Sequence, residues 1–416
     1  MKKYDLIVVG GGFAGVASAI SSAREGAKVL LVEKGNALGG ASVNMLVNPF
    51  MPTKTEIDGE MVDLSQGIFA TIKQRLLQNN ALLNIAFLEE ELKFILNDMI
   101  EEYGIDLLFH AYLCGVNKNG KKIKSISFAT VSGIVECEAD YFIDATGDAS
   151  LAFLAGCPTL LGREEDNLCQ PMTLCFRLGN VDVDKFYASR EKLKIAHEQA
   201  LKNGELINPR ENVLVFKTPI SNVLHFNTTR VVKLNPTSPA HLTKAEVIAR
   251  KQVKEIYEFM KQHADGLENS YLMMTAHEIG IRESRKIVGE YVLTEKDCRN
   301  FTLFEDSICA CNYSIDIHNP EGTGTVFDKF PEGKYYTIPY RSLMSKDIDN
   351  MLVAGRCISS DHGAQASYRI MPTVCCIGEG AGTAMALAVK NKCTIREINV
   401  KELQTLLRKH GAYLGI

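Results

Sequence analysis

The 416-residue sequence lacks several features that would place it in another class of protein. No stretch reaches the roughly 18 consecutive apolar residues that a membrane span needs. The first predicted strand starts at residue 4, which leaves no room for a signal peptide. Acidic and basic residues are mixed, with a net charge of −4, so nothing favours nucleic acid or an anionic membrane. We therefore expect a cytoplasmic protein that binds neither.

The 12 cysteines form none of the CxxC pairs that bind metal, and no metal site is predicted. Many lie in apolar surroundings, such as Cys375 and Cys376, so we interpret them as free thiols in a reducing compartment. The alternative is a redox pair, for which Cys309 and Cys311 are the best candidates. Most buried cysteines are simply small apolar residues, which favours the first interpretation.

What is present at the N-terminus is the pattern of a nucleotide-binding unit. An apolar run over 4–9 predicts a buried parallel strand, and Gly10-x-Gly12-x-x-Gly15 follows it directly. Gly10 permits a tight turn, Gly12 lets the backbone approach a pyrophosphate, and Gly15 allows the next helix to pack closely on the strand. The order of strand, glycines and helix is a far stronger signal than the glycines alone.

The start of that helix and the following strand complete the unit. The helix N-terminus, at Phe13 and Ala14, offers unpaired N–H groups and a positive dipole end to phosphates. Glu33 ends the second strand, 29–32, where its carboxylate can accept ribose hydroxyls. A second glycine-rich turn follows where a bound dinucleotide needs close backbone contact, and it comprises Gly39, Gly40, Ala41 and Ser42.

Beyond this unit the chain alternates between helices and short strands. The pattern predicts an amphipathic helix over 85–103 and short strands near 105–114, 121–130 and 133–138. An apolar strand over 141–144 then runs into a turn of small residues, Ala145, Thr146 and Gly147. Ligands bind at such turns, because they stand at the carboxyl ends of parallel strands.

Residues 156–340 follow another pattern, which is typical of an inserted α+β domain. A long helix is predicted from Lys244 through Met273, with Thr243 as N-cap and Glu246 as its capping-box partner. The strand-like stretches around it are 172–179, 212–217, 223–235 and 308–317. A strand over 350–356 then returns to the first sheet, and a helix of small residues is predicted from near Gly380 to Lys390.

Together these segments resemble the FAD-dependent oxidoreductase family with a glutathione-reductase-like FAD domain, from residue 4 to about residue 410. The resemblance is closest to the bacterial branch that carries the strand end Ile143-Asp144-Ala145-Thr146-Gly147-Asp148. Further similar blocks are 280–285, 314–318 and 353–382. The resemblance implies an α/β fold: a Rossmann-like FAD-binding domain, with a central parallel sheet, a three-stranded meander and helices, and an inserted α+β substrate domain. The expected boundaries are 1–155 and 341–416 for the FAD-binding domain and 156–340 for the insertion.

Two departures from better-known relatives narrow the chemistry. No cysteine pair follows Gly40, where disulfide reductases carry theirs, so dithiol chemistry is not expected. No second glycine triplet follows a strand in the middle of the chain, so no built-in NAD(P)H domain is expected either. We expect the flavin to exchange a hydride with one substrate and electrons with a separate acceptor or donor.

The resemblance also implies which residues hold FAD. The pyrophosphate would lie on Gly10 to Gly15, and the flavin N1/C2 edge would face the N-terminus of the helix near Gly380, which stabilises negative charge on the reduced ring. Tyr112 and Leu113 would line the adenine. The remaining expected cofactor contacts are Glu33, Lys34, Gly40, Ala41, Ser42, Ala145, Thr146, Gly147, Gly355, Arg356, Arg369, Met371, Thr373, Gly380 and Ala381.

Candidate catalytic residues are histidines and arginines. Oxidation of an alcohol or amine needs a base, and histidine suits this near neutral pH. On a strand, Asp316 and His318 would share a face as an orienting pair, and His362 follows the returning strand. On a helix, Arg282 and Arg285 would share a face and, with Arg341 or Arg369, clamp a carboxylate. Salt bridges to neighbouring glutamates are the alternative for both arginines.

These features favour an FAD-dependent oxidoreductase that acts on a small polar metabolite: a sugar, a polyol or an organic acid. Within the enzyme class, the alternative is a reductase of an activated alkene that uses an arginine as proton donor. A second class is a non-catalytic flavin subunit that relays electrons. An NAD-dependent dehydrogenase explains neither the 144–148 turn nor the return to the sheet. The sequence leaves assembly into a homo-oligomer open.

Overall fold

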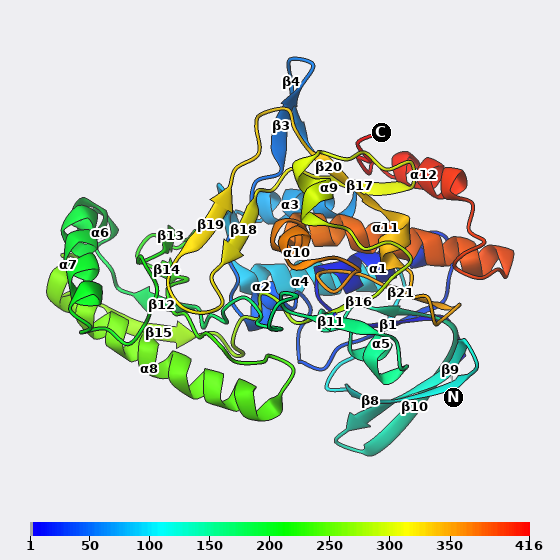
Figure 1. The fold of residues 1–416 in the computed structure, drawn as a ribbon, viewed down its shortest axis with the longest axis horizontal. Helices are drawn as coiled ribbons and strands as arrows, with labels where there is room; N and C mark the ends of the chain where they lie inside the picture. Colours follow the sequence, from blue (N-terminus) through cyan, green and yellow to red (C-terminus); the bar gives the residue numbers. More distant parts are fainter. Residues whose placement is uncertain (1–2) are drawn as a thin grey trace.

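A parallel sheet forms the centre of the protein in the computed structural model, which describes residues 3–416 (Figure 1). Every neighbouring pair of its five strands is parallel. In spatial order the strands are β7 (Asp106–Leu108), β2 (Val29–Val32), β1 (Tyr4–Val9), the last part of β10 (Gly133–Asp144) and β21 (Met351–Val353). The predicted return of the chain to this sheet near residue 350 is therefore confirmed.

The central strand β1 is buried on both faces because its side chains alternate between two hydrophobic cores. Leu6 and Val8 point into one core, and Ile7 and Val9 into the other. The first face is covered by α1 (Phe13–Arg24), α3 (Ile68–Gln78), α4 (Glu89–Glu102) and α11 (Met371–Asn391). The second is covered by α5 (Ser150–Leu154) and a meander of β8 (Tyr112–Asn119), β9 (Lys122–Thr130) and the first part of β10. We call this assembly the sheet domain.

Two strand boundaries differ from the prediction. The segments 133–138 and 141–144 form one long strand, β10, which pairs with β9 first and with β1 afterwards. The segment 105–114 is two strands, β7 and β8, separated by His110 in a left-handed conformation. The meander is therefore continuous with the parallel sheet, because strand β10 belongs to both.

A second body, which we call the cap, comprises residues 172–279 and lies to one side of the sheet domain (Figure 1). Its antiparallel sheet has the order β13 (Val215–Lys217), β14 (Leu224–Phe226), β12 (Phe176–Gly179) and β15 (Tyr271–Thr275). Its helices are α6 (Val183–Ala188), α7 (Arg190–Lys202) and α8 (Pro239–His263). They bury a separate hydrophobic core with that sheet.

The long cap helix begins and ends earlier than predicted. Ser238, not Thr243, is the N-cap of α8, because Pro239 fits the first turn of a helix. The helix ends at His263, before a turn at Gly266 that has a φ of +83°. The last predicted helical residues, 271–273, belong instead to strand β15 (Tyr271–Thr275).

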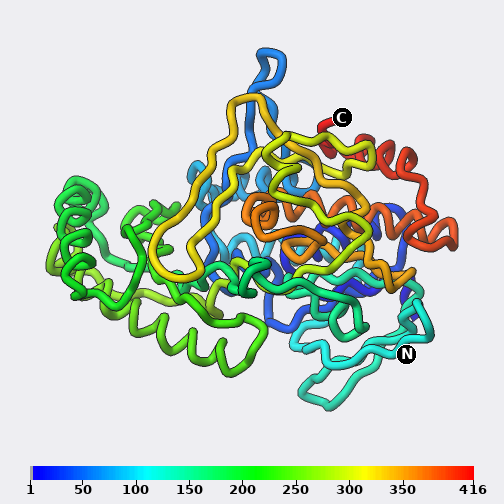
Figure 2. Tube along the Cα trace, in the orientation of Figure 1, coloured from blue at the N-terminus to red at the C-terminus, as the bar shows by residue number. Residues whose placement is uncertain are grey.

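Two short antiparallel pairs come from the segment between the cap and the return of the chain to the parallel sheet. The predicted strand 308–317 is two strands, β17 (Ser307–Cys311) and β18 (Ile315–His318). β17 pairs with β20 (Tyr336–Pro339) in the first core, while β18 pairs with β19 (Thr325–Asp328). Figure 2 shows the β18–β19 hairpin, in yellow, reaching toward the cap. The domain boundaries at 155 and 340 stay predictions.

The remaining elements are short and belong neither to the parallel sheet nor to the cap. They are α2 (Ala41–Asn44), β3 (Lys54–Ile57), β4 (Glu60–Asp63), β5 (Leu82–Leu83), β6 (Ala86–Phe87), β11 (Thr159–Leu161), β16 (Arg285–Ile287), α9 (Glu295–Arg299), the 3-10 turn Tyr340–Leu343, α10 (His362–Tyr368) and α12 (Val400–Lys409).

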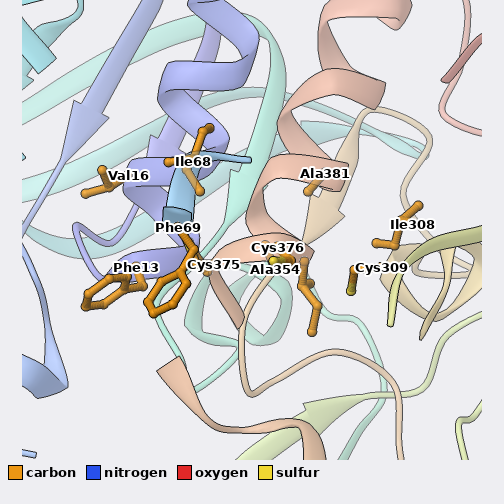
Figure 3. Packing of buried hydrophobic residues seen from close by; sticks show 14 of the residues in the cluster. Phe13, Val16, Ile68, Phe69, Ile308, Cys309, Ala354, Cys375, Cys376 and Ala381 are labelled. Carbon is orange, nitrogen blue, oxygen red and sulfur yellow. The ribbon is translucent and has the colours of Figure 1, made fainter. Parts of the chain in front are cut away.

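Helix α11 runs through the first core, and it begins at Met371 rather than near Gly380. Figure 3 shows Cys375, Cys376 and Ala381 on this helix among the buried residues of the core. Its length and hydropathy alone would allow it to cross a membrane, yet 89% of that window is buried inside the protein. Small residues let α11 approach α1: a Cβ on Gly378 would lie 2.2 Å from the Ala14 carbonyl oxygen. Pro372 explains the early start, since proline fits the first turn of a helix.

Every cysteine that the structure describes is a free thiol, as the apolar surroundings predict. Cys309 and Cys311 stand two residues apart on β17, and both are buried. Burial raises the pKa of both thiols, so they stay protonated at neutral pH. These properties are those of core residues rather than of a reactive pair.

Candidate functional site

The glycine turn after β1 has the geometry that a nucleotide cradle requires. Gly10 has a φ of +105°, and a Cβ there would lie 2.4 Å from the carbonyl oxygen of Ala145. A Cβ on Gly15 would lie 1.7 Å from the Gly10 carbonyl oxygen, so helix and turn pack backbone to backbone. Gly12 differs, since the nearest atom to its Cβ position is the Cα of Gly40 at 3.9 Å. Gly12 therefore borders open space, as an approach to a pyrophosphate requires.

The start of α1 offers donors to an anion. Within residues 3–416 no side chain caps this helix, and its first turn, at Phe13 and Ala14, holds no acidic residue. Glu33 is buried at the end of β2, where it accepts hydrogen bonds from Gly11 N at 2.6 Å and Gly35 N at 2.7 Å. The uncapped N–H groups of α1 suit a phosphate, and the nearby carboxylate of Glu33 suits the ribose hydroxyls.

The second glycine turn packs against the first. Gly12 and Gly39 form an isolated parallel bridge, and Ser42 Oγ donates to the Gly39 carbonyl at 2.8 Å. Lys34 Nζ lies 2.9 Å from Glu278 Oε2 of the cap. Burial alone would lower the pKa of Lys34, but the charge of Glu278 outweighs it and raises the pKa. The expected cofactor contact at Lys34 thus also ties the cap to the sheet domain.

The turn after β10 lies beside Arg356. Arg356 Nη2 donates to Asp148 Oδ1 at 2.7 Å, and Gly147, with a φ of +77°, leaves room for the guanidinium. Burial would raise the pKa of Asp148, but the charge of Arg356 and a hydrogen bond from Ser284 hold it below its usual range. Thr146 Oγ1 donates to the buried Asp144 at 2.7 Å.

The other expected cofactor residues occupy separate places. Tyr112 and Leu113 begin β8, and the Tyr112 side chain is exposed. Gly355 has a φ of +93°, with Ala14 of α1 3.2 Å from its Cβ position. Gly380 and Ala381 are buried in the middle of α11, so the predicted helix start there is wrong. A Cβ on Gly380 would lie 2.8 Å from Ile308, so this glycine serves helix packing.

A cavity of about 610 Å³ lies between the sheet domain and the cap. Ala41, Arg356 and Met371 line it from the side of the glycine turns. Met371 starts α11, and among the described residues no side chain caps this helix and its first turn is free of acidic residues. An uncapped helix N-terminus therefore borders the cavity, nine residues before Gly380, and its contact with a flavin stays a prediction.

Asp316 and His318 line the same cavity from β18, and they share a face as the alternation predicts. His318 Nε2 lies 3.4 Å from Asp316 Oδ2, and Arg230 Nη2 lies 3.1 Å from His318 Nδ1. Burial, with the charge of Arg282 added, lowers the pKa of His318 to about 3, so the imidazole is neutral at neutral pH. Burial would raise the pKa of Asp316, but its hydrogen bond to His318 and the charge of Arg369 hold it well below its usual range.

Arg282 and Arg369 also line the cavity. Arg282 Nη1 donates to the Pro171 carbonyl at 2.7 Å and to Thr173 Oγ1. Arg369 Nη2 donates to Gln170 Oε1 at 3.2 Å and lies 3.9 Å from Asp316 Oδ2. Burial and the neighbouring arginines lower the pKa of Arg282 to about 9.

Three predicted candidates lie elsewhere. Arg282 and Arg285 do not share a helix: Arg285 starts strand β16 and stacks on Phe153, with its guanidinium carbon 4.3 Å from the ring centroid. His362 Nδ1 lies 2.8 Å from Glu283 Oε2, and His362 is not among the residues that line the cavity. Arg341 pairs with Asp306 at 2.9 Å near the surface. Extended backbone explains the first error, because residues three apart on it point to opposite sides.

Sequence reasoning missed two cap arginines, Arg210 and Arg230. Arg210 lines the cavity beside Glu211, and Arg230 is almost fully buried against the β18–β19 hairpin. Arg230 does stand inside the predicted strand 223–235, but Asn227, Thr228, Thr229 and Lys233 of that stretch are polar as well, so the sequence carries no signal that singles it out.

Comparison with known proteins places the chain in a family. The profile of the FAD-dependent oxidoreductase family matches residues 5–407, and the chain belongs to this family. A 46-residue segment is 56% identical to glutathione reductase of Debaryomyces hansenii, covering 11% of this chain and 9% of that protein. A 145-residue segment is 34% identical to mercuric reductase of Staphylococcus aureus, covering 31% of this chain and 25% of that protein. The matched segments thus span at most a quarter of these two relatives.

Among solved structures, the chain is similar to p-nitrophenol 4-monooxygenase of Pseudomonas putida. The TM-score is 0.49 and the identity 9%, over 100% of this chain and 88% of that one. It is also similar to a geranylgeranyl bacteriochlorophyll reductase-like protein of Thermoplasma acidophilum, with a TM-score of 0.45 and 13% identity, over 98% and 84% of the two chains.

Family membership confirms that the protein is an oxidoreductase and that FAD is its cofactor. The residues present fit that group: Gly12 leaves room beside the uncapped start of α1, and the uncapped start of α11 borders the cavity. The first site would hold the pyrophosphate and the second the flavin edge.

Proposed function

We propose that the protein transfers a hydride between a small polar metabolite, which is a sugar, a polyol or an organic acid, and flavin N5. A separate acceptor or donor then exchanges electrons with the cofactor. The observation that carries this proposal is the shared cavity. It joins the start of α11, at Met371, to the polar side chains of Asp316 and His318. A polar molecule in it would lie against both.

The residues on β18 suit a proton transfer. FAD, when bound, supplies the two-electron chemistry. In the oxidation direction a hydroxyl or amine must also lose a proton, and His318 lines the cavity unprotonated. Its pKa of about 3 makes it a weak base, so the negative charge of a bound substrate must raise that pKa for the transfer to occur. Asp316, at 3.4 Å, would stabilise the imidazolium that forms. We therefore assign His318 the role of base and Asp316 that of the orienting group.

Reduction of an activated alkene is a second candidate, and Arg282 favours it. Burial and neighbouring positive charges lower the pKa of this guanidinium to about 9, which makes it a better proton donor than an ordinary arginine. In that reaction a hydride adds to one alkene carbon and the proton from Arg282 to the other. The cavity supports either reaction better than it supports a flavin subunit that only relays electrons.

The location and partners of the protein are also proposals. The free thiols support a reducing compartment, which for this chain we take to be the cytoplasm. We propose a small-molecule substrate as the main partner, with no nucleic acid and no membrane, since the net charge is only −4. Assembly into a homo-oligomer stays a prediction.

The test begins with an absorption spectrum of the purified protein, recorded before and after acid precipitation. We expect oxidised-flavin bands that are released as FAD. Anaerobic titration with polyols, sugars and hydroxy acids should then bleach the bands if the protein oxidises its substrate. Reoxidation of the reduced protein by an unsaturated dicarboxylate would favour the alkene reaction instead. A colourless protein that takes up no added FAD would contradict the proposal.

A further inference from the structure

Four arginines meet at the cap side of the cavity. Arg210 precedes β13, Arg230 follows β14, Arg282 precedes β16, and Arg369 precedes α11. Arg210, Arg282 and Arg369 line the cavity, while Arg230 stands behind His318. Arg282 interacts electrostatically with the other three, so the four act on one region of space.

Some N–H donors of this cluster make no hydrogen bond within the described chain. Arg230 is held by the Gly324 carbonyl at 2.9 Å and by Glu211 at 3.1 Å. Arg210 is 4% exposed, and its Nε makes one long contact, 3.4 Å, to Asn212. Within the described chain, Arg210 Nη1 and Arg369 Nε find no hydrogen-bond acceptor. Buried guanidinium groups are normally paired, because their desolvation is otherwise costly.

The cluster also carries more positive charges than negative charges. Among the described residues, the carboxylates that interact with this cluster are Glu211 and Asp316, and His318 is neutral. Arg356 does not change this balance, since it is paired with Asp148 at 2.7 Å. An excess of two positive charges on arginines beside a cavity indicates an anionic occupant.

We propose that this arginine cluster binds the carboxylate groups of the substrate, so that the metabolite is an organic acid, and a dicarboxylic acid in particular. The inference rests on the proposed function and selects one of its three substrate classes. A planar guanidinium fork matches a carboxylate with two parallel hydrogen bonds. The rest of the cavity wall includes the apolar residues Leu214, Phe216 and Ile281, which would contact the carbon skeleton of the acid.

Binding of malonate to the FAD-loaded protein, measured by calorimetry, tests the proposal. Malonate carries two carboxylates, and malonamide has the same shape without charge. We expect malonate to bind and malonamide to bind at least tenfold more weakly. Equal binding of both, or no binding of malonate, overturns the proposal without any variant. Inorganic phosphate distinguishes the other source of a dianion: tighter binding of phosphate than of malonate also overturns it.

Variants then assign the binding to the cluster. Arg210→Gln should raise the Kd for malonate about tenfold or more, because a hydrogen bond between charged groups is lost, and Arg210→Lys should restore part of the affinity. Arg250→Gln is the matched control, since Arg250 lies on α8 and pairs with Glu246. An unchanged Kd in Arg210→Gln, with a thermal midpoint equal to that of the wild type, overturns the assignment.

The outcome is separable from that of the proposed function. A protein that holds FAD and binds malonate, but is neither bleached nor reoxidised by any substrate, supports the arginine site and contradicts the hydride transfer. A protein that polyols bleach and malonate does not bind supports the hydride transfer and overturns the arginine site.

Discussion

Substitution by alanine should affect the stability of the FAD-free protein in opposite ways at two glycines of the first turn, Gly10 and Gly12. Gly10 has a φ of +105°, and its Cβ position lies 2.4 Å from the backbone of Ala145. Gly12 has an ordinary φ of −72°, and the nearest atom to its Cβ position is 3.9 Å away. One glycine is therefore required by the fold and the other by the ligand.

The magnitudes follow from these two environments. In Gly10→Ala, the left-handed backbone alone costs about 1–3 kcal/mol, and the backbone of Ala145 must shift as well. In Gly12→Ala, the FAD-free protein should be as stable as the wild type or more stable by about 0.4–1 kcal/mol. FAD at about 100 times its Kd stabilises a protein by about 2.7 kcal/mol. Each tenfold loss of affinity in Gly12→Ala removes about 1.4 kcal/mol of that effect.

Thermal unfolding with and without added FAD separates the two effects. We expect Gly10→Ala to unfold at a lower temperature even without FAD. We expect Gly12→Ala to unfold normally without FAD, and to gain less stability when FAD is added. An unchanged Kd for FAD in Gly12→Ala would refute the placement of the pyrophosphate. A loss of stability in FAD-free Gly12→Ala equal to that in Gly10→Ala would refute the distinction between them.

Three further predictions concern packing and buried charge. Glu89→Gln should lower the free energy of unfolding by about 3–5 kcal/mol in urea titrations, because it leaves the buried Arg177 of β12 without its charged partner on α4. Gly378→Ala should lower the thermal midpoint through a cost of about 1–3 kcal/mol, because α11 must move away from α1. Burial lowers the pKa of His225 from 6.5 to about 3, so the unfolded chain binds the extra proton first and stability falls as the pH drops from 6.5 toward 3. His225→Leu should reduce that fall by about 2 kcal/mol between pH 6.5 and 5, measured by urea unfolding at both values.

Each of these has a matched control or a contrary outcome. Lys254→Gln removes one partner of an exposed ion pair on α8 and should change the free energy of unfolding by less than about 1 kcal/mol. Gly322→Ala should be neutral, since nothing within the described chain lies within 4 Å of its Cβ position. A pH dependence of unfolding that is the same in His225→Leu and in the wild type would show that this histidine is not buried in a neutral form.

The N-terminal unit was predictable because its determinants are local. The apolar run of β1, the three glycines and Glu33 follow one another within 30 residues, and each is tied to a single backbone requirement. The small-residue turn at Ala145 was predictable for the same reason. The start of α11 was not, because glycines at 378, 380 and 382 look like a helix-opening turn, whereas they serve a close contact with α1 and β17.

The arginine cluster shows the limit of such reasoning. Asp316 and His318 could be paired from sequence, since alternation on one strand places them together. Arg282 and Arg369 were candidates for a carboxylate clamp, but with Arg285 or Arg341 as further members. Arg210 and Arg230 come from other segments, and no local pattern relates them to the first two.

The sequence by itself determined the nucleotide-binding unit, the parallel strands and the family, because short-range periodicity and glycine spacing specify them. Only the tertiary structure decided which charged residues share the cavity and which lie elsewhere. Docking of the cap and of the β18–β19 hairpin against the sheet domain removes water from these groups. Their electrostatics, and hence the chemistry of the site, arise from that burial and from contacts between distant segments.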